Sequence, residues 1–205
     1  MKNLLFALFI LISIQSNAQF GIAGVELSNN KSQVYTITTK NGKTYKTKKY
    51  GIKTALKIKE IKFETIEGDK KTLALSQLDK IVSKGKKDRH NFTEKYIKYS
   101  KSKSDLMTEV ISGKVSLYQR SQTNFNAPTG MGMSSNSTSL SYYVIKEGQN
   151  IAKYLKGNNI DYGRFKTNAI KFFSDCESLV KKIKNKKYKR KHLEDIVNYY
   201  NENCN

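Results

Sequence analysis

The residues best suited to chemistry in this sequence form a run of cations near its C-terminus. Residues 181–191 contain eight lysine or arginine side chains in eleven positions. A dense run of this kind attracts polyanions. Two interpretations stay open: a patch that binds a polyanion, and a solvated linker whose charges partly complement the end of a helix. The candidate binding residues are Lys181, Lys182, Lys184, Lys186, Lys187, Lys189, Arg190 and Lys191.

The two cysteines, Cys176 and Cys204, are the second feature with chemical potential. An even number of cysteines in an oxidising compartment favours a disulfide. We expect Cys176 in the first turn of one helix and Cys204 just past the end of the next, positions that lie together in an antiparallel helix hairpin. A closed loop of about 29 residues would contribute roughly 3–4 kcal/mol on the chain-entropy account. The alternative is two free thiols, with Cys176 activated at a helix N-terminus.

The sequence shows no catalytic or metal-binding arrangement. Its two histidines, His90 and His192, have no partner at metal-ligand spacing. The motifs of phosphate-binding loops, nucleophile elbows and zinc hydrolases are absent, and no carboxylate pair stands out for glycoside hydrolysis. A nucleophile pair of Cys176 and His192 would require an open disulfide. We therefore expect no catalytic residue, metal or cofactor, and we keep an envelope-associated hydrolase with an unfamiliar site as the alternative.

The N-terminus predicts export. Lys2 lies in a short positive region, residues 4–14 are an almost unbroken apolar run, and Ala18 ends a small-x-small cleavage motif. The apolar run is about half of the roughly 20 residues that a membrane-spanning helix needs. We expect residues 1–18 to be a cleaved signal peptide, with Gln19 as the first residue of the mature chain. No later segment is apolar enough to span a bilayer, so the expected location is the periplasm, the cell surface or the extracellular space.

The whole sequence is strongly basic, because 38 Lys and Arg residues oppose 17 Asp and Glu residues, for a formal net charge of +21. Such an excess attracts polyanions. Outside the cytoplasm we expect a non-enzymatic protein that binds an acidic polysaccharide, lipopolysaccharide or an envelope protein; nucleic acid is not the expected partner. The competing interpretation is that abundant lysine is only a compositional habit of AT-rich genomes.

The elements that must position these residues begin with a β-rich unit at residues 19–86. Residues 34–40 alternate and are β-branched, and Asn41-Gly42 is a strong hairpin signal. Residues 43–50 then return as a lysine-rich strand suited to a sheet edge. After residue 55 the apolar residues change from even positions to odd positions. A regular strand would point these two sets to opposite faces of the sheet, so the change predicts a bulge or break near Lys59-Glu60.

A second β-rich unit is predicted at residues 87–156. Its expected strands are residues 92–99, 113–118, 140–145 and 151–155, whereas 105–111 could be a strand or a short helix. Residues 121–139 are rich in Ser, Asn, Gly and Thr and predict a mobile loop. The two units could be separate, or could form one continuous barrel-like sheet.

The hydrophobic period changes from two to 3.6 after Gly157, so residues 157–205 predict a helical tail. Ser174 and Glu177 fit a capping box at the start of its second helix, and apolar residues from Leu193 to Tyr200 define the third. The expected fold class is α+β: an antiparallel β-rich N-terminal two-thirds, followed by a three-helix C-terminal tail closed by a disulfide.

Several strings carry a resemblance: FFSDCESL (172–179), KKI (181–183), IVNYYNENC (196–204), GKVSLY (113–118) and the signal end at Ala18-Gln19. Together they resemble exported, signal-peptide-bearing proteins of the Bacteroidota, flavobacteria especially, which have no assigned activity. The resemblance covers residues 90–205. It implies an exported protein with a β-rich body and a disulfide-closed helical tail, and it carries over no catalytic or ligand residue. The sequence departs from the pattern at Glu177, where proline is common, which affects only a helix start.

Overall fold

The computed structural model describes residues 33–55, 58–85, 91–125, 136–157 and 162–204. Within these residues a ten-stranded antiparallel sheet is followed by three α-helices, so the predicted α+β class is confirmed. The strand order is β10-β9-β8-β7-β6-β5-β1-β2-β3-β4. No helix in this described part is long and apolar enough to cross a membrane.

The strands pair almost entirely in chain order. Only β1 and β5 are neighbours in the described sheet without being consecutive in the chain. The strands are β1 (Val34–Thr39), β2 (Thr44–Ala55), β3 (Ile58–Thr65), β4 (Lys70–Ala74), β5 (Leu78–Lys84), β6 (Phe92–Lys98), β7 (Ser104–Ile111), β8 (Val115–Phe125), β9 (Asn136–Lys146) and β10 (Lys153–Gly157).

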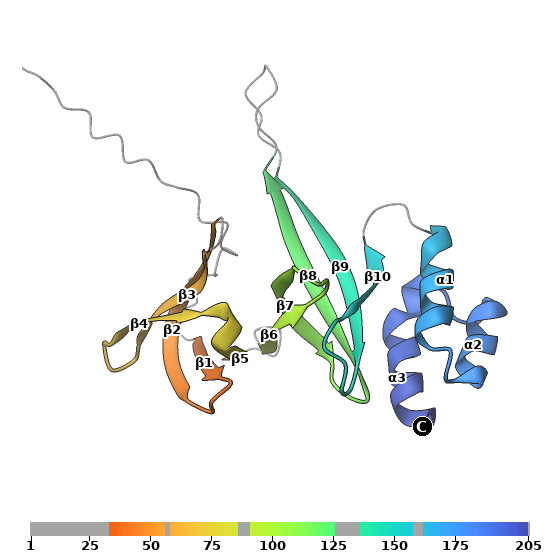
Figure 1. Cartoon of the computed structure of the whole chain (residues 1–205), viewed down its shortest axis with the longest axis horizontal. Helices are drawn as coiled ribbons and strands as arrows, with labels where there is room; N and C mark the ends of the chain where they lie inside the picture. Colours follow the sequence, from red (N-terminus) through yellow and green to blue (C-terminus); the bar gives the residue numbers. More distant parts are fainter. Residues whose placement is uncertain (1–32, 56–57, 86–90, 126–135, 158–161, 205) are drawn as a thin grey trace, which may run out of the picture.

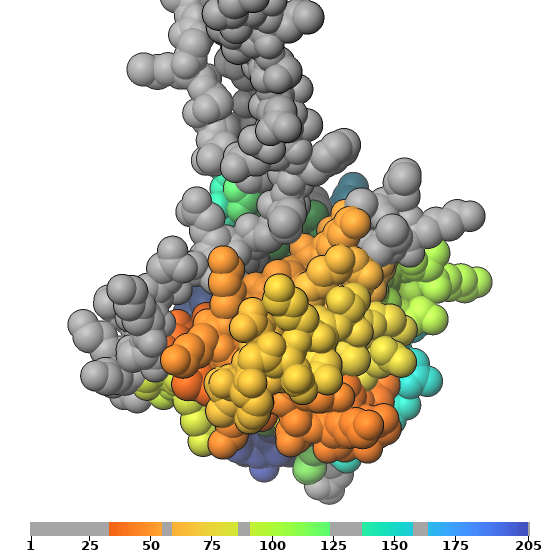
Figure 2. Space-filling model, turned by 90° about the vertical axis from the view of Figure 1, so that its left-hand side faces the viewer, coloured from red at the N-terminus to blue at the C-terminus, as the bar shows by residue number. Residues whose placement is uncertain are grey.

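The first five strands hold the buried residues of a core at one end of the molecule (Figure 1), and side chains of β6 and β7 pack against it. The predicted hairpin is present: Gly42 adopts a φ of +83° between β1 and β2, a conformation that favours glycine. A short 3-10 turn, η1 (Leu75–Gln77), separates β4 from β5. Figure 2 shows the outer surface of this end, formed by β2, β3 and β4 in orange and yellow. The buried core residues are Tyr35, Ile37, Tyr50, Ile61, Phe63, Leu75, Leu78 and Ile81.

The predicted irregularity near Lys59-Glu60 is wrong, because β3 keeps an unbroken register with β2 there. The bulge lies on β2 instead, between Thr47 and Tyr50. The Thr47 hydroxyl stabilises it by accepting the Lys49 N–H at 3.1 Å. Ile61 and Phe63 are buried apolar residues of β3 and share one parity, so the strand stays regular without a bulge, and Leu56 lies outside the described residues.

The two predicted β-rich units belong to one continuous sheet. β5 pairs with β6 from Lys80↔Lys95 to Ser83↔Phe92. The hydroxyl of Tyr50 on β2 also donates to the Glu94 carboxylate on β6 at 2.7 Å. Burial raises the pKa of Glu94, and the bond from Tyr50 only partly offsets this effect.

The strands β6–β10 carry a core on each face. One face meets the helices through Val115, Leu117, Val144 and Leu155. The opposite face gathers Met107, Tyr118, Tyr143 and Ala152. The Ala152 N–H donates to the Lys98 carbonyl at 2.8 Å, so the sheet curls until the start of β10 reaches the end of β6.

The predicted mobile loop at residues 121–139 is too long at both ends. β8 and β9 pair without interruption from Val115↔Lys146 to Phe125↔Asn136, so residues 121–125 and 136–139 form strands. Ladder hydrogen bonds come from the backbone, so polar Ser, Thr and Asn side chains do not prevent them. Residues 126–135 lie outside the described residues.

Three helices cover one face of β8–β10, as Figure 1 shows. They are α1 (Tyr162–Phe172), α2 (Glu177–Lys184) and α3 (Leu193–Asn203), with a short 3-10 turn η3 (Arg190–His192) before α3. The predicted capping box is wrong: Cys176 is the N-cap of α2, and no side chain caps it. The chain turns at residues 173–175, which places Glu177 at the first helical position instead of the third.

The predicted disulfide is confirmed: Cys176 and Cys204 join the start of α2 to the end of α3. Two polar contacts also attach the tail to the sheet. The Asn201 amide accepts the Val115 N–H at 2.7 Å and donates to the Val115 carbonyl at 3.0 Å. Lys114 Nζ donates to the Cys204 carbonyl at 2.8 Å.

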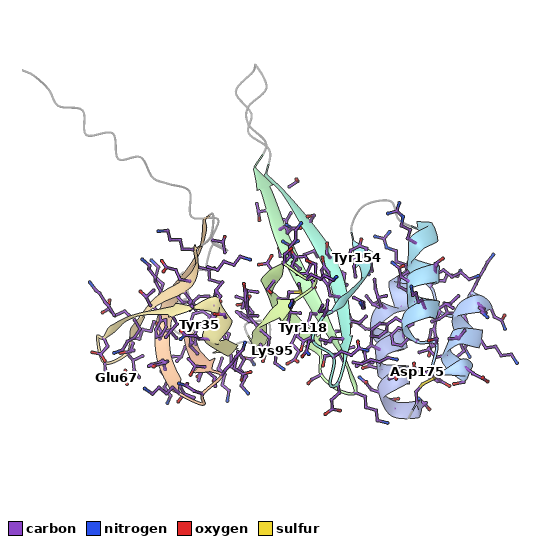
Figure 3. The ribbon with its side chains drawn as sticks, in the orientation of Figure 1. Tyr35, Glu67, Lys95, Tyr118, Tyr154 and Asp175 are labelled. Atoms are coloured by element: carbon purple, nitrogen blue, oxygen red, sulfur yellow. A yellow bond between two sulfur atoms is a disulfide. The ribbon has the colours of Figure 1, made fainter. Side chains whose placement is uncertain are left out.

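A carboxylate forms a further link between the tail and the sheet. Asp175 accepts hydrogen bonds from Lys146 at 2.7 Å and from the Tyr200 hydroxyl at 2.6 Å. Partial burial alone would raise the pKa of Asp175, but these two bonds hold it below the usual value. Figure 3 shows Asp175 at the helical end of the molecule.

Candidate anion-binding groove

A groove of about 520 Å³ lies where β10, α1, the end of α2 and η3 meet. Phe165 and Ile183, which are 4% and 2% exposed, form its apolar floor together with the half-buried Tyr188. No acidic side chain occurs among the described residues that line it. Its cations are Lys156, Lys166, Lys186, Lys189, Arg190 and Lys191. We call this site the cationic groove.

The end of α2 folds back to build one wall of the cationic groove. The Lys186 N–H donates to the Ile183 carbonyl at 3.2 Å, and the Lys187 N–H donates to the Lys182 carbonyl at 3.0 Å. This pair of bonds is the Schellman pattern of a helix C-terminus. Lys186 takes the left-handed position, with a φ of +60°. Glycine is the usual residue there, since a side chain adds steric cost at positive φ.

The stretch after this cap is held by a second local contact. The Lys189 N–H donates to His192 Nδ1 at 3.2 Å, and the His192 N–H donates to the Lys189 carbonyl at 2.8 Å. These bonds form the turn of η3 and bring Lys189, Arg190 and Lys191 to the groove. His192 therefore has a structural role here, whereas His90 lies outside the described residues.

The structure brings four of the eight candidate cations to the groove: Lys186, Lys189, Arg190 and Lys191. The other four, Lys181, Lys182, Lys184 and Lys187, do not line it. Lys182 Nζ makes cation–π contacts instead, lying 3.6 Å from the centre of the Tyr199 ring and 5.9 Å from the centre of the Tyr188 ring. Only half of the cationic run therefore lines the groove.

Two groove cations, Lys156 and Lys166, were missed from the sequence. Lys156 lies at the end of β10 and Lys166 in the first turns of α1, so neither belongs to the run at 181–191. Lys166 Nζ donates to the Lys184 carbonyl at 3.3 Å, which holds α1 against the end of α2. The local pattern gave no signal for either residue, because only the packing of α1 on β10 brings them together.

The groove crowds positive charge, and Lys156 is the residue most affected. Burial lowers the pKa of the Lys156 ammonium, and the nearby Arg190 lowers it further, while Glu194 acts in the opposite direction. Burial and like charge both disfavour the protonated form of a lysine. The charge of an anion in the groove would offset both effects, because an opposite charge favours the protonated form of the lysine.

A second groove, of about 760 Å³, lies on β2, β3 and β4, on the end of the molecule shown in Figure 2. It also has lysines, but acids accompany them. Lys62 pairs with Glu60 at 3.2 Å, and Lys71 pairs with Asp69 at 3.2 Å. Glu64 lines the groove itself. It is larger than the cationic groove, but acidic side chains partly neutralise its lysines.

The face of β6–β8 opposite the helices holds ionised groups that already satisfy one another. Lys95 Nζ donates to Glu109 at 2.8 Å, and the Tyr118 hydroxyl donates to the same oxygen at 3.1 Å; Figure 3 shows Lys95 and Tyr118 close together. Arg120 pairs with Asp105 at 2.6 Å. These contacts stabilise the sheet. Among the described residues, no group of three His, Cys, Asp or Glu side chains could hold a metal ion.

No protein-family model matches the chain, and neither a curated protein nor a solved structure matches it. The cationic groove must therefore be interpreted from its own residues.

Proposed function

We propose that this protein is an exported, non-enzymatic binding protein for a polyanionic partner of the cell envelope, an acidic glycan or lipopolysaccharide, which it holds in the cationic groove. One observation carries the proposal: six cations from β10, α1 and the 186–191 stretch meet around one groove whose described lining contains no acid. A concave site with converging charges of one sign favours a ligand of the opposite sign.

The local backbone supports a functional role for these cations. Lys186 occupies a left-handed position at the end of α2, where glycine would cost about 1 kcal/mol less. A lysine at this position also complements the helix dipole, but exposed Lys181 and Lys184 already place charge in the same last turn. Binding of an anion by the Lys186 ammonium would explain why the less stable residue is used.

A salt series with heparin and lipopolysaccharide tests the proposal on the purified, oxidised protein. Binding should weaken steeply as salt rises, because each contact depends on screened charge. The double substitution Lys189→Gln and Lys191→Gln should reduce affinity about tenfold or more at low salt, as expected for the loss of two cationic contacts of about 1 kcal/mol each.

The matched control is Lys181→Gln and Lys184→Gln, which removes the same charge from exposed positions of the same run outside the groove. This control should lose much less affinity than the groove variant. Equal losses in the two variants would show that binding follows net charge alone. In that case the lysines are compositional, and an envelope protein becomes the partner to seek.

A further inference from the structure

Resting on the proposed function, we infer that the ligand of the cationic groove is an amphiphile: a phosphate-bearing lipid whose headgroup contacts the cations while part of its acyl chain lies on the floor formed by Phe165, Ile183 and Tyr188. The inference identifies the proposed polyanionic ligand as one chemical class, a phosphate-bearing lipid. It depends on the apolar floor of the groove, whereas the proposed function depends on the positive charge of the groove.

The floor suits a hydrocarbon better than a sugar. Phe165 and Ile183 have no polar side-chain atom and close the base of the groove with the small part of each that is exposed, whereas Tyr188 and the aliphatic stems of the lysines supply the wider apolar surface. A glycan or nucleic-acid backbone placed there would lose water without gaining hydrogen bonds, which is unfavourable. An alkyl chain has no such penalty and gains about 0.8 kcal/mol for each methylene removed from water.

Tyr188 extends this floor as an aromatic edge. Its ring packs at 6.0 Å from Tyr199 and at 6.3 Å from His192, between ring centres, which fixes its position. The aliphatic stems of lysines can also cover apolar surface while their ammonium groups stay in water. The lysines that surround the floor are therefore suited to contact both parts of an amphiphile.

The dimensions fit one lipid headgroup with part of one chain. The volume of about 520 Å³ lies within the roughly 300–1,000 Å³ typical of small-molecule sites. The cations come from three separate segments, residues 156, 166 and 186–191, so they meet around one headgroup only in the folded tail. Phosphate is the shared chemistry of lipid headgroups and free phosphate, and an experiment can separate these two sources.

Titration calorimetry with inorganic phosphate, butyl phosphate, hexyl phosphate and octyl phosphate at one salt concentration tests the inference. The charged group is nearly constant along the series, so any gain reports contact with the floor. Affinity should rise by up to about fourfold per methylene, which corresponds to 0.8 kcal/mol per buried methylene. The rise should stop once the chain is longer than the floor.

Two variants separate the floor from the charges. Tyr188→Ser should flatten the dependence of affinity on chain length, because it removes the aromatic edge of the floor. The double substitution Lys189→Gln and Lys191→Gln should weaken all alkyl phosphates by one common factor. The control Lys181→Gln and Lys184→Gln should change neither quantity. Circular dichroism confirms that each variant is folded, and the series on the unsubstituted protein needs no variant at all.

The outcomes distinguish this inference from the proposed function. Equal affinities for inorganic and octyl phosphate, or no binding of octyl phosphate, would overturn the lipid inference. Salt-sensitive heparin binding at the groove would still stand in that case and would point to an acidic glycan. Loss of groove-dependent binding to heparin and lipopolysaccharide would instead overturn the proposed function.

Discussion

The contact between Asn201 and Gly113 offers a stringent test of how the helical tail is attached. The Asn201 amide forms two hydrogen bonds with Val115, which is completely buried at the start of β8. Asn201→Ala would remove both bonds and leave a buried N–H and C=O unpaired. At about 1 kcal/mol for each bond plus the cost of the unpaired groups, we expect a loss of about 2–4 kcal/mol in the free energy of unfolding.

Gly113 allows this contact because it has no side chain. A Cβ at position 113 would lie 2.5 Å from Asn201 Nδ2 and 2.8 Å from its Cγ, so the amide would have to move. The φ of Gly113 lies outside the left-handed region, so alanine fits the backbone itself. Gly113→Ala should therefore cost about 1–2 kcal/mol in the unsubstituted protein, through displacement of the amide alone.

The double-mutant cycle gives the decisive result. In the Asn201→Ala background the clash is gone, and Gly113→Ala should become neutral or stabilise by up to about 1 kcal/mol, because alanine restricts the unfolded chain. Urea unfolding of the oxidised protein, followed by circular dichroism, measures all four species. Gly51→Ala is the matched control, since nothing lies near its Cβ position, and it should not couple to Asn201. Equal costs of Gly113→Ala in both backgrounds would refute the argument.

Four further outcomes are expected. Lys186→Gly should raise the free energy of unfolding by about 0.5–1 kcal/mol in thermal denaturation while weakening heparin binding, because glycine tolerates the positive φ. The Glu94 pKa is raised above 4.5, so between pH 4.5 and the raised pKa the folded state keeps a proton that the unfolded state loses. The free energy of unfolding should therefore fall as pH rises through this range. Glu94→Gln should remove this fall, as measured by urea titrations at several pH values. The Asp175 pKa is held below 3.8, so the carboxylate stabilises the fold fully above that pH, and the stabilisation disappears as pH falls through the lowered pKa. Asp175→Asn should make the free energy of unfolding less dependent on pH in this acidic range, in the same titrations. Replacement of Cys176 and Cys204 by serine should lower stability by about 3–4 kcal/mol, and an unchanged denaturant midpoint would contradict this.

Local signals predicted much of the fold. The Asn41-Gly42 turn depends on the backbone freedom of one glycine. The helices of the tail were predictable because each one places its apolar residues on a single face, which gives the sequence a hydrophobic period of 3.6. The disulfide was also predictable, because Cys176 and Cys204 bracket a helix hairpin. The turn and the helices are each determined by residues close together in the sequence, and the disulfide is determined by the only possible pairing of two cysteines.

The features that were not predicted depend on contacts between distant segments. The strands β8 and β9 continue through polar residues because each provides the other's backbone partners, which side-chain composition does not reveal. Lys156 and Lys166 join the groove only when α1 packs on β10. The amide of Asn201 pairs with a strand residue 86 positions earlier. Cationic composition led to the prediction of a polyanionic ligand, which stays a prediction, whereas the apolar floor became visible only in the structure.

The order of strand pairing has a consequence for how the molecule assembles. In the described sheet only the β1–β5 pair skips over intervening strands, so the loops to be closed are short and contact order is low for a β protein. All the buried residues of the N-terminal core lie between β1 and β5, although Phe92, Tyr96 and Leu106 of β6 and β7 pack against it. Strands β6 to β10 can then add one at a time to the open edge of β5. The tail can dock only after β8 and β9 have paired, because its core residues pack on both. The protein should therefore fold progressively from its N-terminal half, and the cationic groove should be the last part to form.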